Sequence, residues 1–167
     1  MTTTMTTEFD QRTLRTLFGR FPSGIVAICA HVDGEPVGMA ASSFTSVSLD
    51  PPLLSVCFSH TSSTWPRLRR APRLGISVFA ADQEAHVRQL SAKSGDRFQD
   101  LDHQRTSQGA VLLAGAAAWF ECVPETELEG GDHAVALLRV AAARAFPDVA
   151  PLIFHDSGFH AISASSA

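Results

Sequence analysis

Cysteines, runs of like charge and long apolar runs are all scarce in this chain of 167 residues. Its three cysteines, Cys29, Cys57 and Cys122, are odd in number and far apart, which excludes a disulfide framework and a Cys-x-x-Cys metal clip. We expect three buried thiols in a reducing compartment. No apolar run reaches the roughly 18 residues of a membrane span, and the Met/Thr-rich start lacks the charged-then-apolar order of a signal peptide. A cytoplasmic protein without membrane contact is therefore predicted.

The chain also lacks the clustered lysines and arginines that bind a phosphate backbone, and its formal charge is -4. Nucleic acid is therefore not expected as a partner. Between Arg67 and Arg73 lie four arginines, beside Pro66 and Pro72. This segment fits a solvated helix face, and contact between its arginines and a single phosphate group stays open.

Several catalytic and nucleotide-binding motifs are absent as well. No Gly-x-Gly-x-x-Gly follows a predicted strand, which disfavours a doubly wound nucleotide-binding fold. No serine or cysteine lies in a nucleophile elbow, and no pair of histidines has metal-ligand spacing. The sequence therefore predicts neither nucleophilic catalysis nor a metal site.

The composition fits one compact domain, with 45% hydrophobic and 18% charged residues. We expect a single domain over 9–163, a disordered N-terminal tail at 1–8 and a short C-terminal tail at 164–167. A helix is predicted near the start, capped by Thr7 and ended by Pro22. Its apolar stripe, at helical spacing, consists of Leu14, Leu17, Phe18 and Phe21.

Short β-rich segments make up most of the remaining chain. Asp33-Gly34 is typical of a hairpin turn between the first two strands. Two short helices are predicted, one starting at Trp65 and capped by Ser63 or Thr64, the other capped by Asp82. The predicted strands cover 25–31, 53–58, 74–80, 111–113, 116–123, 137–146, 152–154 and 159–162, with a further strand within 38–52. About seven antiparallel strands with few helices favour a small barrel over a sheet of alternating strands and helices.

The segment 38–52 combines two patterns. Val47 and Leu49 alternate with serines as in a strand, whereas 41–45 offers small side chains and hydroxyls where bulky strand residues are usual. Small residues inside a strand indicate the close approach of another group. An edge strand with a Ser/Thr face remains the alternative.

Hydroxyl side chains gather at Ser59-His-Thr-Ser-Ser-Thr64, in five of six positions. This number exceeds what one helix cap requires, and backbone amides at a helix start favour a phosphate. In the long loop that follows, Phe98 either pins the loop to the core or covers a ligand. Arg97 beside it either pairs with a neighbouring aspartate or reaches a ligand phosphate.

A tight turn is predicted at Gly130-Gly131-Asp132-His133. It places a titratable imidazole at the start of the next strand. A histidine in this position is either a turn residue alone or a functional group at the mouth of the barrel.

Seven segments, in this order and spacing, resemble the flavin reductase-like family, and the resemblance runs from Leu14 to about Ile162. They are Phe21-Pro-Ser-Gly-Ile25, Gly38 to Pro52, Ser62-Ser-Thr-Trp65, Asp96-Arg-Phe98, Gly109 to Gly115, Glu121-Cys122 and Gly131-Asp-His133. The resemblance implies a mainly β, FMN-binding split barrel with short flanking helices. It also implies a homodimer and an NAD(P)H-dependent flavin reductase that supplies reduced flavin, by diffusion, to a partner monooxygenase.

The resemblance also implies roles for individual residues. His133 would meet the nicotinamide of NADH or NADPH as the catalytic residue. The residues implied to bind FMN or FAD are Met39, Ala40, Ala41, Ser42, Ser43, Ser46, Val47 and Ser48 for the ring and ribityl chain, Ser59, His60, Ser63 and Thr64 for the phosphate, and Arg97 and Phe98 on a loop closing over the flavin. The chain departs from the family pattern at Val111 and Leu138, and it has no tyrosine near Phe154 and Phe159. A flavin carrier or sensor without catalysis is the alternative.

Overall fold

The computed structural model describes residues 5–162. The predicted tail at 164–167 and the first four residues of the tail at 1–8 lie outside this range. No helix within it is long and apolar enough to cross a membrane. The helices are α1 (Gln11–Gly19), α2 (Trp65–Leu68) and α3 (Glu84–Leu90). The strands are β1 (Ser23–Gly24), β2 (Val26–Val32), β3 (Glu35–Ala41), β4 (Thr45–Leu49), β5 (Pro52–Ser59), β6 (Leu74–Val78), β7 (His103–Arg105), β8 (Val111–Leu113), β9 (Ala118–Gly130), β10 (His133–Ala145), β11 (Leu152–His155) and β12 (Gly158–Ala161).

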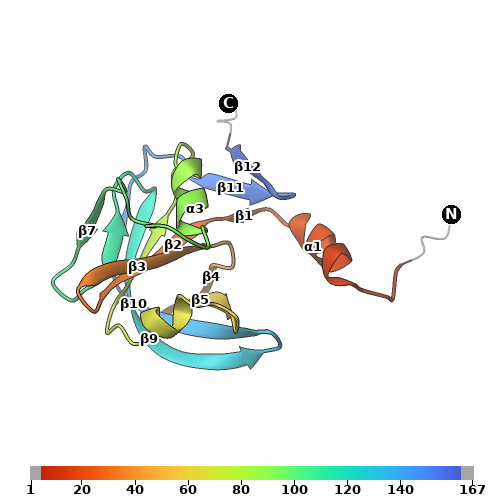
Figure 1. Ribbon diagram of the computed structural model, residues 1–167, viewed down its shortest axis with the longest axis horizontal. Helices are drawn as coiled ribbons and strands as arrows, with labels where there is room; N and C mark the ends of the chain where they lie inside the picture. The colour runs from red at the N-terminus through yellow and green to blue at the C-terminus, as the bar shows by residue number, and fades with distance from the viewer. Residues whose placement is uncertain (1–4, 163–167) are drawn as a thin grey trace.

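The main sheet curls into a barrel with an open seam (Figure 1). Its strand order is β3-β2-β6-β9-β10-β5-β4, and every pairing is antiparallel. Strands β3 and β4 follow each other in the chain yet stand at opposite ends of this order, so no ladder joins them in the described part of the chain. At the seam, Ser43 Oγ accepts a hydrogen bond from Cys57 N at 2.9 Å and lies 3.2 Å from Cys57 O. The predicted split barrel is confirmed.

Alternating side chains build the interior of the barrel. In β5, Leu54, Val56 and Phe58 are buried while their neighbours are partly exposed, as the period of two requires. Helix α2 covers the interior, because Trp65 stacks on Phe58 with ring centroids 3.7 Å apart. The short α2 is therefore a core element as well as one wall of the seam.

A second apolar cluster lies on the outer face of β2. Strand β2 is buried on nearly every residue, because its other face packs against α3, β8 and the β11–β12 hairpin. Members of this cluster include Ile25, Cys29, Leu90 and Leu113. Phe98 of the long loop packs against the same cluster. It therefore attaches the loop to the core, which is one of the two roles predicted for Phe98.

Both predicted turns are present. Asp33 and Gly34 adopt positive φ values of 52° and 90° between β2 and β3, as a two-residue hairpin turn requires. Gly131, with φ 75°, makes the turn between β9 and β10. These two strands have 13 residues each, longer than predicted, because pairing continues up to His133 itself.

Two of the three predicted helix caps are wrong, and the third is right in position only. Asp10 rather than Thr7 caps α1, since its carboxylate accepts from Thr13 N at 2.7 Å. Thr64, one of the two predicted alternatives, does stand at the capping position of α2, but its side chain makes no capping hydrogen bond. Ser62 Oγ accepts instead, from Trp65 N at 3.1 Å. Helix α3 begins later than expected, so Asp82 lies outside it and the capping position falls on Gln83. Thr7 and Asp82 are suitable residue types, but a neighbour one to three positions away holds the capping position of α1 and α3.

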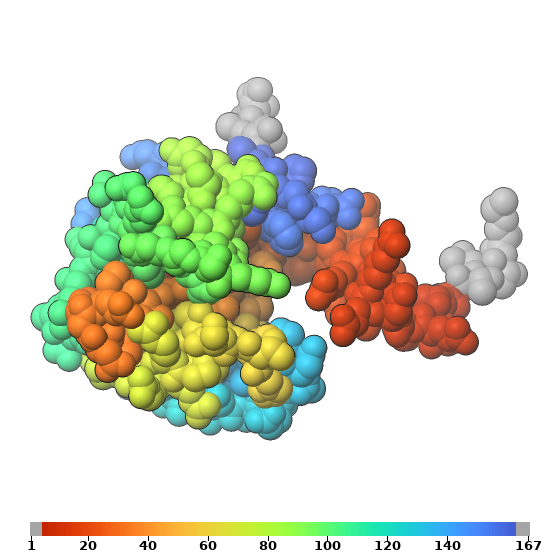
Figure 2. Space-filling model, viewed as in Figure 1, coloured from red at the N-terminus to blue at the C-terminus, as the bar shows by residue number. Residues whose placement is uncertain are grey.

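The predicted apolar stripe forms at Leu14, Leu17 and Phe18, whereas Phe21 lies beyond the end of α1, and the stripe finds no cover within the described chain. Helix α1 buries none of its residues, and Leu17, Phe18 and Phe21 are 48%, 71% and 78% exposed. Figure 2 shows α1 in red, standing clear of most of the barrel. Its attachment is Asp156 N, which donates to Gly19 O at 2.9 Å.

Candidate functional site

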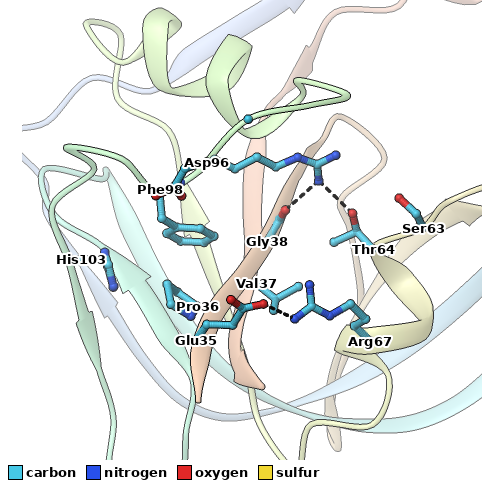
Figure 3. A pocket seen from close by; sticks show the side chains of 12 residues that line it. Glu35, Pro36, Val37, Gly38, Ser63, Thr64, Arg67, Asp96, Phe98 and His103 are labelled. Atoms are coloured by element: carbon cyan, nitrogen blue, oxygen red, sulfur yellow. Dashed lines mark hydrogen bonds and ion pairs between the residues drawn. The ribbon is translucent and has the colours of Figure 1, made fainter. Parts of the chain in front are cut away.

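A cleft runs along the free edge of β3, the edge that pairs with no other strand in the described residues. Its volume is about 730 Å³. One wall is the start of α2 and the other is the loop after α3 (Figure 3). The lining residues are Glu35, Pro36, Val37, Gly38, Ser63, Thr64, Arg67, Gly95, Asp96, Arg97, Phe98 and His103. Four of the predicted flavin-binding residues, Ser63, Thr64, Arg97 and Phe98, therefore meet in one place.

Arg97 bridges the walls of this cleft. Its Nη1 donates to Gly38 O at 3.1 Å and to Thr64 Oγ1 at 2.8 Å, and its Nε donates to Ala92 O at 2.8 Å. The predicted ion pairs with Asp96 or Asp100 do not form. Asp96 Oδ1 accepts instead from Phe98 N at 2.8 Å. The guanidinium thus fixes the loop to β3 and α2 while standing beside the cleft.

Gly38 allows the loop to approach β3 this closely. A Cβ at this position would lie 2.5 Å from Cys29 Sγ and 2.9 Å from the tip of the Phe98 ring. Phe98 also meets His103 edge to face, with centroids 5.3 Å apart. The Phe98 ring is therefore held in place by Gly38 on one side and His103 on the other, and it lines the cleft.

A smaller cavity of about 190 Å³ continues on β3 beyond Gly38. Ala40, Ala41 and Ser42 line it, together with Phe154 and Phe159 of the C-terminal hairpin. The small side chains of 40–42 thus border open space, as the sequence pattern indicated. This cavity and the larger cleft share the same strand, so together they follow β3 along most of its length.

Other predicted residues face the protein rather than a cavity. Met39 packs against the barrel core, and its sulfur lies 3.9 Å from Ser62 Oγ. The Ser43 hydroxyl is engaged with Cys57, as described above. Ser46, Val47 and Ser48 lie on β4, where an irregular register at Val47 breaks the pairing with β5. A ligand in contact with Met39 or Ser43 would therefore meet their backbone.

His133 stands at the start of β10, as predicted. Its Nδ1 lies 2.7 Å from Asp132 Oδ1, and the imidazole is 42% exposed. The hydrogen bond from His133 holds the pKa of the Asp132 carboxyl below its usual value. Because an ionised carboxylate only accepts, Nδ1 donates and Nε2 faces away from Asp132. The turn thus presents an oriented imidazole.

The predicted phosphate ligands divide into two groups. Ser63 and Thr64 line the large cleft, whereas Ser59 pairs with His133 across the sheet. His60 Nε2 lies 3.2 Å from Glu129 Oε2, so its imidazole faces a carboxylate at the β9–β10 turn. Only the first group shares a wall with Arg97.

Sequence reasoning missed Glu35 as a lining residue and did not single out Arg67 among the arginines of 67–73. Arg67 Nη2 lies 2.6 Å from Glu35 Oε1 across the cleft. The sequence predicted a solvated helix face for these arginines and left contact with a phosphate open. The other three arginines pair outside the cleft, with Glu127, Asp33 and Glu121. Nothing in the local sequence singles Arg67 out, because its position depends on the packing of α2 against β3.

The protein-family model described as "Flavin reductase like domain" matches residues 18–163 of this chain. The chain belongs to the flavin reductase-like family. It is 39% identical over 140 residues to a probable flavin reductase of Rhizobium meliloti, covering 83% of this chain but 45% of that protein. It is 34% identical over 146 residues to the reductase subunit HsaB of a flavin-dependent monooxygenase from Rhodococcus jostii, covering 87% of this chain and 75% of the relative.

The structure is similar to that of the NADH:FAD oxidoreductase SgcE6 of Streptomyces globisporus, solved with NAD and FAD fragments. The TM-score is 0.90 at 36% identity, covering 95% of this chain and 96% of the other. The family, the split-barrel fold and the oxidoreductase class predicted from the sequence are confirmed.

Within the described residues, no three or more His, Cys, Asp or Glu side chains form a group that could hold a metal ion.

Proposed function

We propose that this chain is an NAD(P)H:flavin oxidoreductase that transfers hydride from a nicotinamide to FMN or FAD. The observation that carries this proposal is the continuity of the β3 edge. Small residues at 40–42 lead directly to a cleft with an arginine and two hydroxyl side chains. A flavin has the same sequence of parts, a flat ring followed by a polar chain that ends in phosphate.

The residues present fit such a ligand. Arg97 directs three of its hydrogen bonds to the protein, and a guanidinium has five N–H donors, so donors remain for a phosphate. Ser63 is exposed and lines the same cleft as Arg97. The bound flavin supplies the hydride acceptor, and the barrel holds it against β3 so that one face of the ring stays open.

His133 has the role of positioning the nicotinamide. With Nδ1 donating to Asp132, a neutral imidazole has Nε2 free to accept a hydrogen bond from a carboxamide N–H. This interaction orients the donor for transfer without a covalent bond to the protein. Asp132 keeps the imidazole in that orientation.

We further propose a homodimer that completes the flavin site. Exposed apolar side chains gather on α1, and Val47 and Leu49 of β4 are also 49% and 95% exposed. Monomeric proteins rarely expose contiguous apolar patches of large size, and a second copy would cover both surfaces in one self-complementary interface. Because β4 carries residues assigned to the flavin ring, the same interface would place the partner's residues beside the flavin.

The dimer is tested by light scattering on the wild type and on Phe18→Ser/Phe21→Ser. We expect a wild-type dimer, and a variant that dissociates at micromolar concentration with weakened flavin binding. Ile162→Ser serves as the control, because Ile162 is an exposed apolar residue that follows β12 and is not part of α1. A wild-type monomer with full activity at nanomolar concentration would contradict the proposal.

A partner monooxygenase is the expected consumer of the reduced flavin, which would reach it by diffusion. The relative HsaB is named as the reductase subunit of such a monooxygenase. A reducing, cytoplasmic location is part of the proposal, since the three cysteines are unpaired.

The activity is tested by mixing the purified chain with NADH or NADPH and with free FMN or FAD, under air. We expect oxidation of the nicotinamide, followed at its absorbance band, that requires added flavin and is faster with one of the four combinations. A chain that binds flavin but does not accelerate nicotinamide oxidation is a carrier or sensor.

A further inference from the structure

His60 lies at the end of the sheet where His133 begins β10, and it is not among the residues that line the cleft with Arg97. The family resemblance implied that His60 binds the flavin phosphate. We propose instead that His60 is a positioning residue, which holds the β9–β10 turn and through this turn orients His133 toward the nicotinamide. The inference rests on the proposed function, because it concerns the nicotinamide residue of the same site.

His60 contacts the β9–β10 turn at both of its ends. On the β5 side, His60 N donates to Asp132 O at 3.0 Å, one residue beyond the last paired residues Ser59 and His133. On the β9 side, His60 Nε2 lies 3.2 Å from Glu129 Oε2. Because β10 lies between β5 and β9 in the sheet, the imidazole crosses the end of β10 to reach Glu129. A single residue of the chain after β5 therefore contacts both ends of the turn.

The turn between these two contacts contains two successive glycines. Gly131 has φ 75°, and a Cβ at this position would meet no heavy atom of the described chain within 4 Å. Glycine loses more conformational freedom on folding than any other residue. Gly130 and Gly131 therefore need contacts from outside the turn to keep one conformation, and the backbone and the imidazole of His60 provide two such contacts.

The conformation of the turn sets the direction of the His133 imidazole. Asp132 belongs to the turn, and its Oδ1 lies 2.7 Å from His133 Nδ1. Rotation of the Asp132 backbone would break this hydrogen bond and allow the proton to occupy either ring nitrogen. Only the tautomer with the proton on Nδ1 leaves Nε2 to accept from a carboxamide N–H. His60 therefore acts on the nicotinamide through the direction and the tautomer of His133.

The contact between His60 and Glu129 stabilises the turn locally and adds little to the stability of the whole fold. Their side chains are 44% and 85% exposed, so water screens the ion pair. The hydrogen bond and the charge of His133 lower the pKa of the Asp132 carboxyl, and the charge of His60 adds a smaller contribution in the same direction. Loss of the His60 side chain should therefore disturb Asp132 and His133 while the Tm stays the same.

The kinetic test compares NADH oxidation by the wild type, His60→Ala, Glu129→Ala and His60→Gln. We expect His60→Ala and Glu129→Ala each to lower kcat/KM for NADH about fivefold, the upper range for loss of an exposed ion pair, with an unchanged Kd for flavin. His60→Gln should recover most of the activity, because its amide can still donate to Glu129. Thr61→Ala is the matched control, since Thr61 is exposed and its hydroxyl contacts Ser59 rather than the turn.

A double-mutant cycle tests whether His60 acts through His133. We expect His60→Ala to have little further effect in the His133→Ala background, because the imidazole that His60 orients is already missing. Equal losses in both backgrounds would overturn the inference, as would unchanged kinetics of His60→Ala. A raised Kd for flavin in His60→Ala, with kcat unchanged, would also overturn it and return His60 to the flavin phosphate.

Nitrogen NMR of the chain with isotope-labelled histidines tests the positioning without NADH. The His133 signals, assigned by their loss in His133→Ala, should show the proton on Nδ1 in the wild type and a mixture of tautomers in His60→Ala. The same tautomer in both chains would overturn the inference while leaving flavin reduction intact. Absence of NADH oxidation by the wild type with either flavin would refute the proposed function, and the NMR comparison would still decide whether His60 positions His133.

Discussion

Arg97 is predicted to stabilise the folded chain as well as bind flavin. Its three hydrogen bonds join the loop to β3, to α2 and to Ala92 at the end of α3. At about 1 kcal/mol of net stability per hydrogen bond, Arg97→Ala should cost about 3 kcal/mol. For a domain of this size this corresponds to a fall in Tm of about 6–12 °C.

A double-mutant cycle isolates one of these bonds. Thr64→Val keeps the shape of a side chain that is 8% exposed but removes the oxygen that accepts from Arg97. We expect Thr64→Val to cost about 1 kcal/mol in the wild type and much less in Arg97→Ala, since the coupling energy belongs to their shared hydrogen bond. The assay is urea unfolding of the flavin-free chain, with Arg70→Ala as the surface arginine control.

Hydrogen exchange supplies an independent readout. Amides of 92–101 should exchange faster in Arg97→Ala, because the loop loses its attachment to β3. Arg97→Ala could instead lose flavin affinity and still melt within about 1 °C of the wild type, a small fraction of the shift expected above. The guanidinium would then bind the flavin without stabilising the fold. The role of a clamp would then be wrong.

Three further predictions concern other parts of the chain. His133→Ala should lower kcat/KM for NADH about 5- to 150-fold, which corresponds to the loss of one polar contact of about 1–3 kcal/mol. The Kd for flavin, measured by titration, should stay within a few-fold of the wild type. A parallel loss of kcat/KM and of flavin affinity would mean that His133 only shapes the turn. Gly75→Ala should destabilise the fold by about 3 kcal/mol in urea unfolding, because the new Cβ would overlap the Val111 carbonyl, and a wild-type midpoint would contradict this packing. Burial raises the pKa of the Cys29 thiol, and burial together with the charge of the Glu121 carboxylate raises the pKa of the Cys122 thiol to about 12. Both thiols should therefore resist a thiol reagent at pH 8 in the native chain and react when the chain is unfolded. Fast labelling of either cysteine in the native chain would refute its burial.

Local signals in the sequence were sufficient for most of the fold. The hairpin at Asp33-Gly34 and the turn at Gly131 follow from the backbone freedom of glycine and the preference of Asp for turns. The β-rich run at 53–58 predicted β5, and the Trp65-Pro66 pair predicted α2. The predicted caps of α1 and α3 failed because propensity alone does not fix the first residue of a helix to within a few positions.

The site was predictable only in part, because its contacts join distant segments. Arg97 and Thr64 are 33 residues apart, and no pattern within either segment indicates that they meet. The hydroxyl cluster appeared as one group along the chain, but the turn after Ser59 sends its first members toward His133 and its last members toward the cleft. Family resemblance supplied the residues, and only three-dimensional packing separated them into two walls.

The use of a strand edge explains which residues of the site are small and which are large. A ligand bound through the backbone of β3 needs outward-facing side chains that keep their distance, and Gly38 and Ala40 occupy this face. Such a surface can hold the common parts of FMN and FAD but distinguishes them weakly, because both present the same ring and ribityl phosphate. Discrimination must come from side chains that project over the strand from α2 and the loop. Arg67 and Phe98 line the cleft from these two sides, so substitution there should change the affinity for a bound ligand while β3 stays the same.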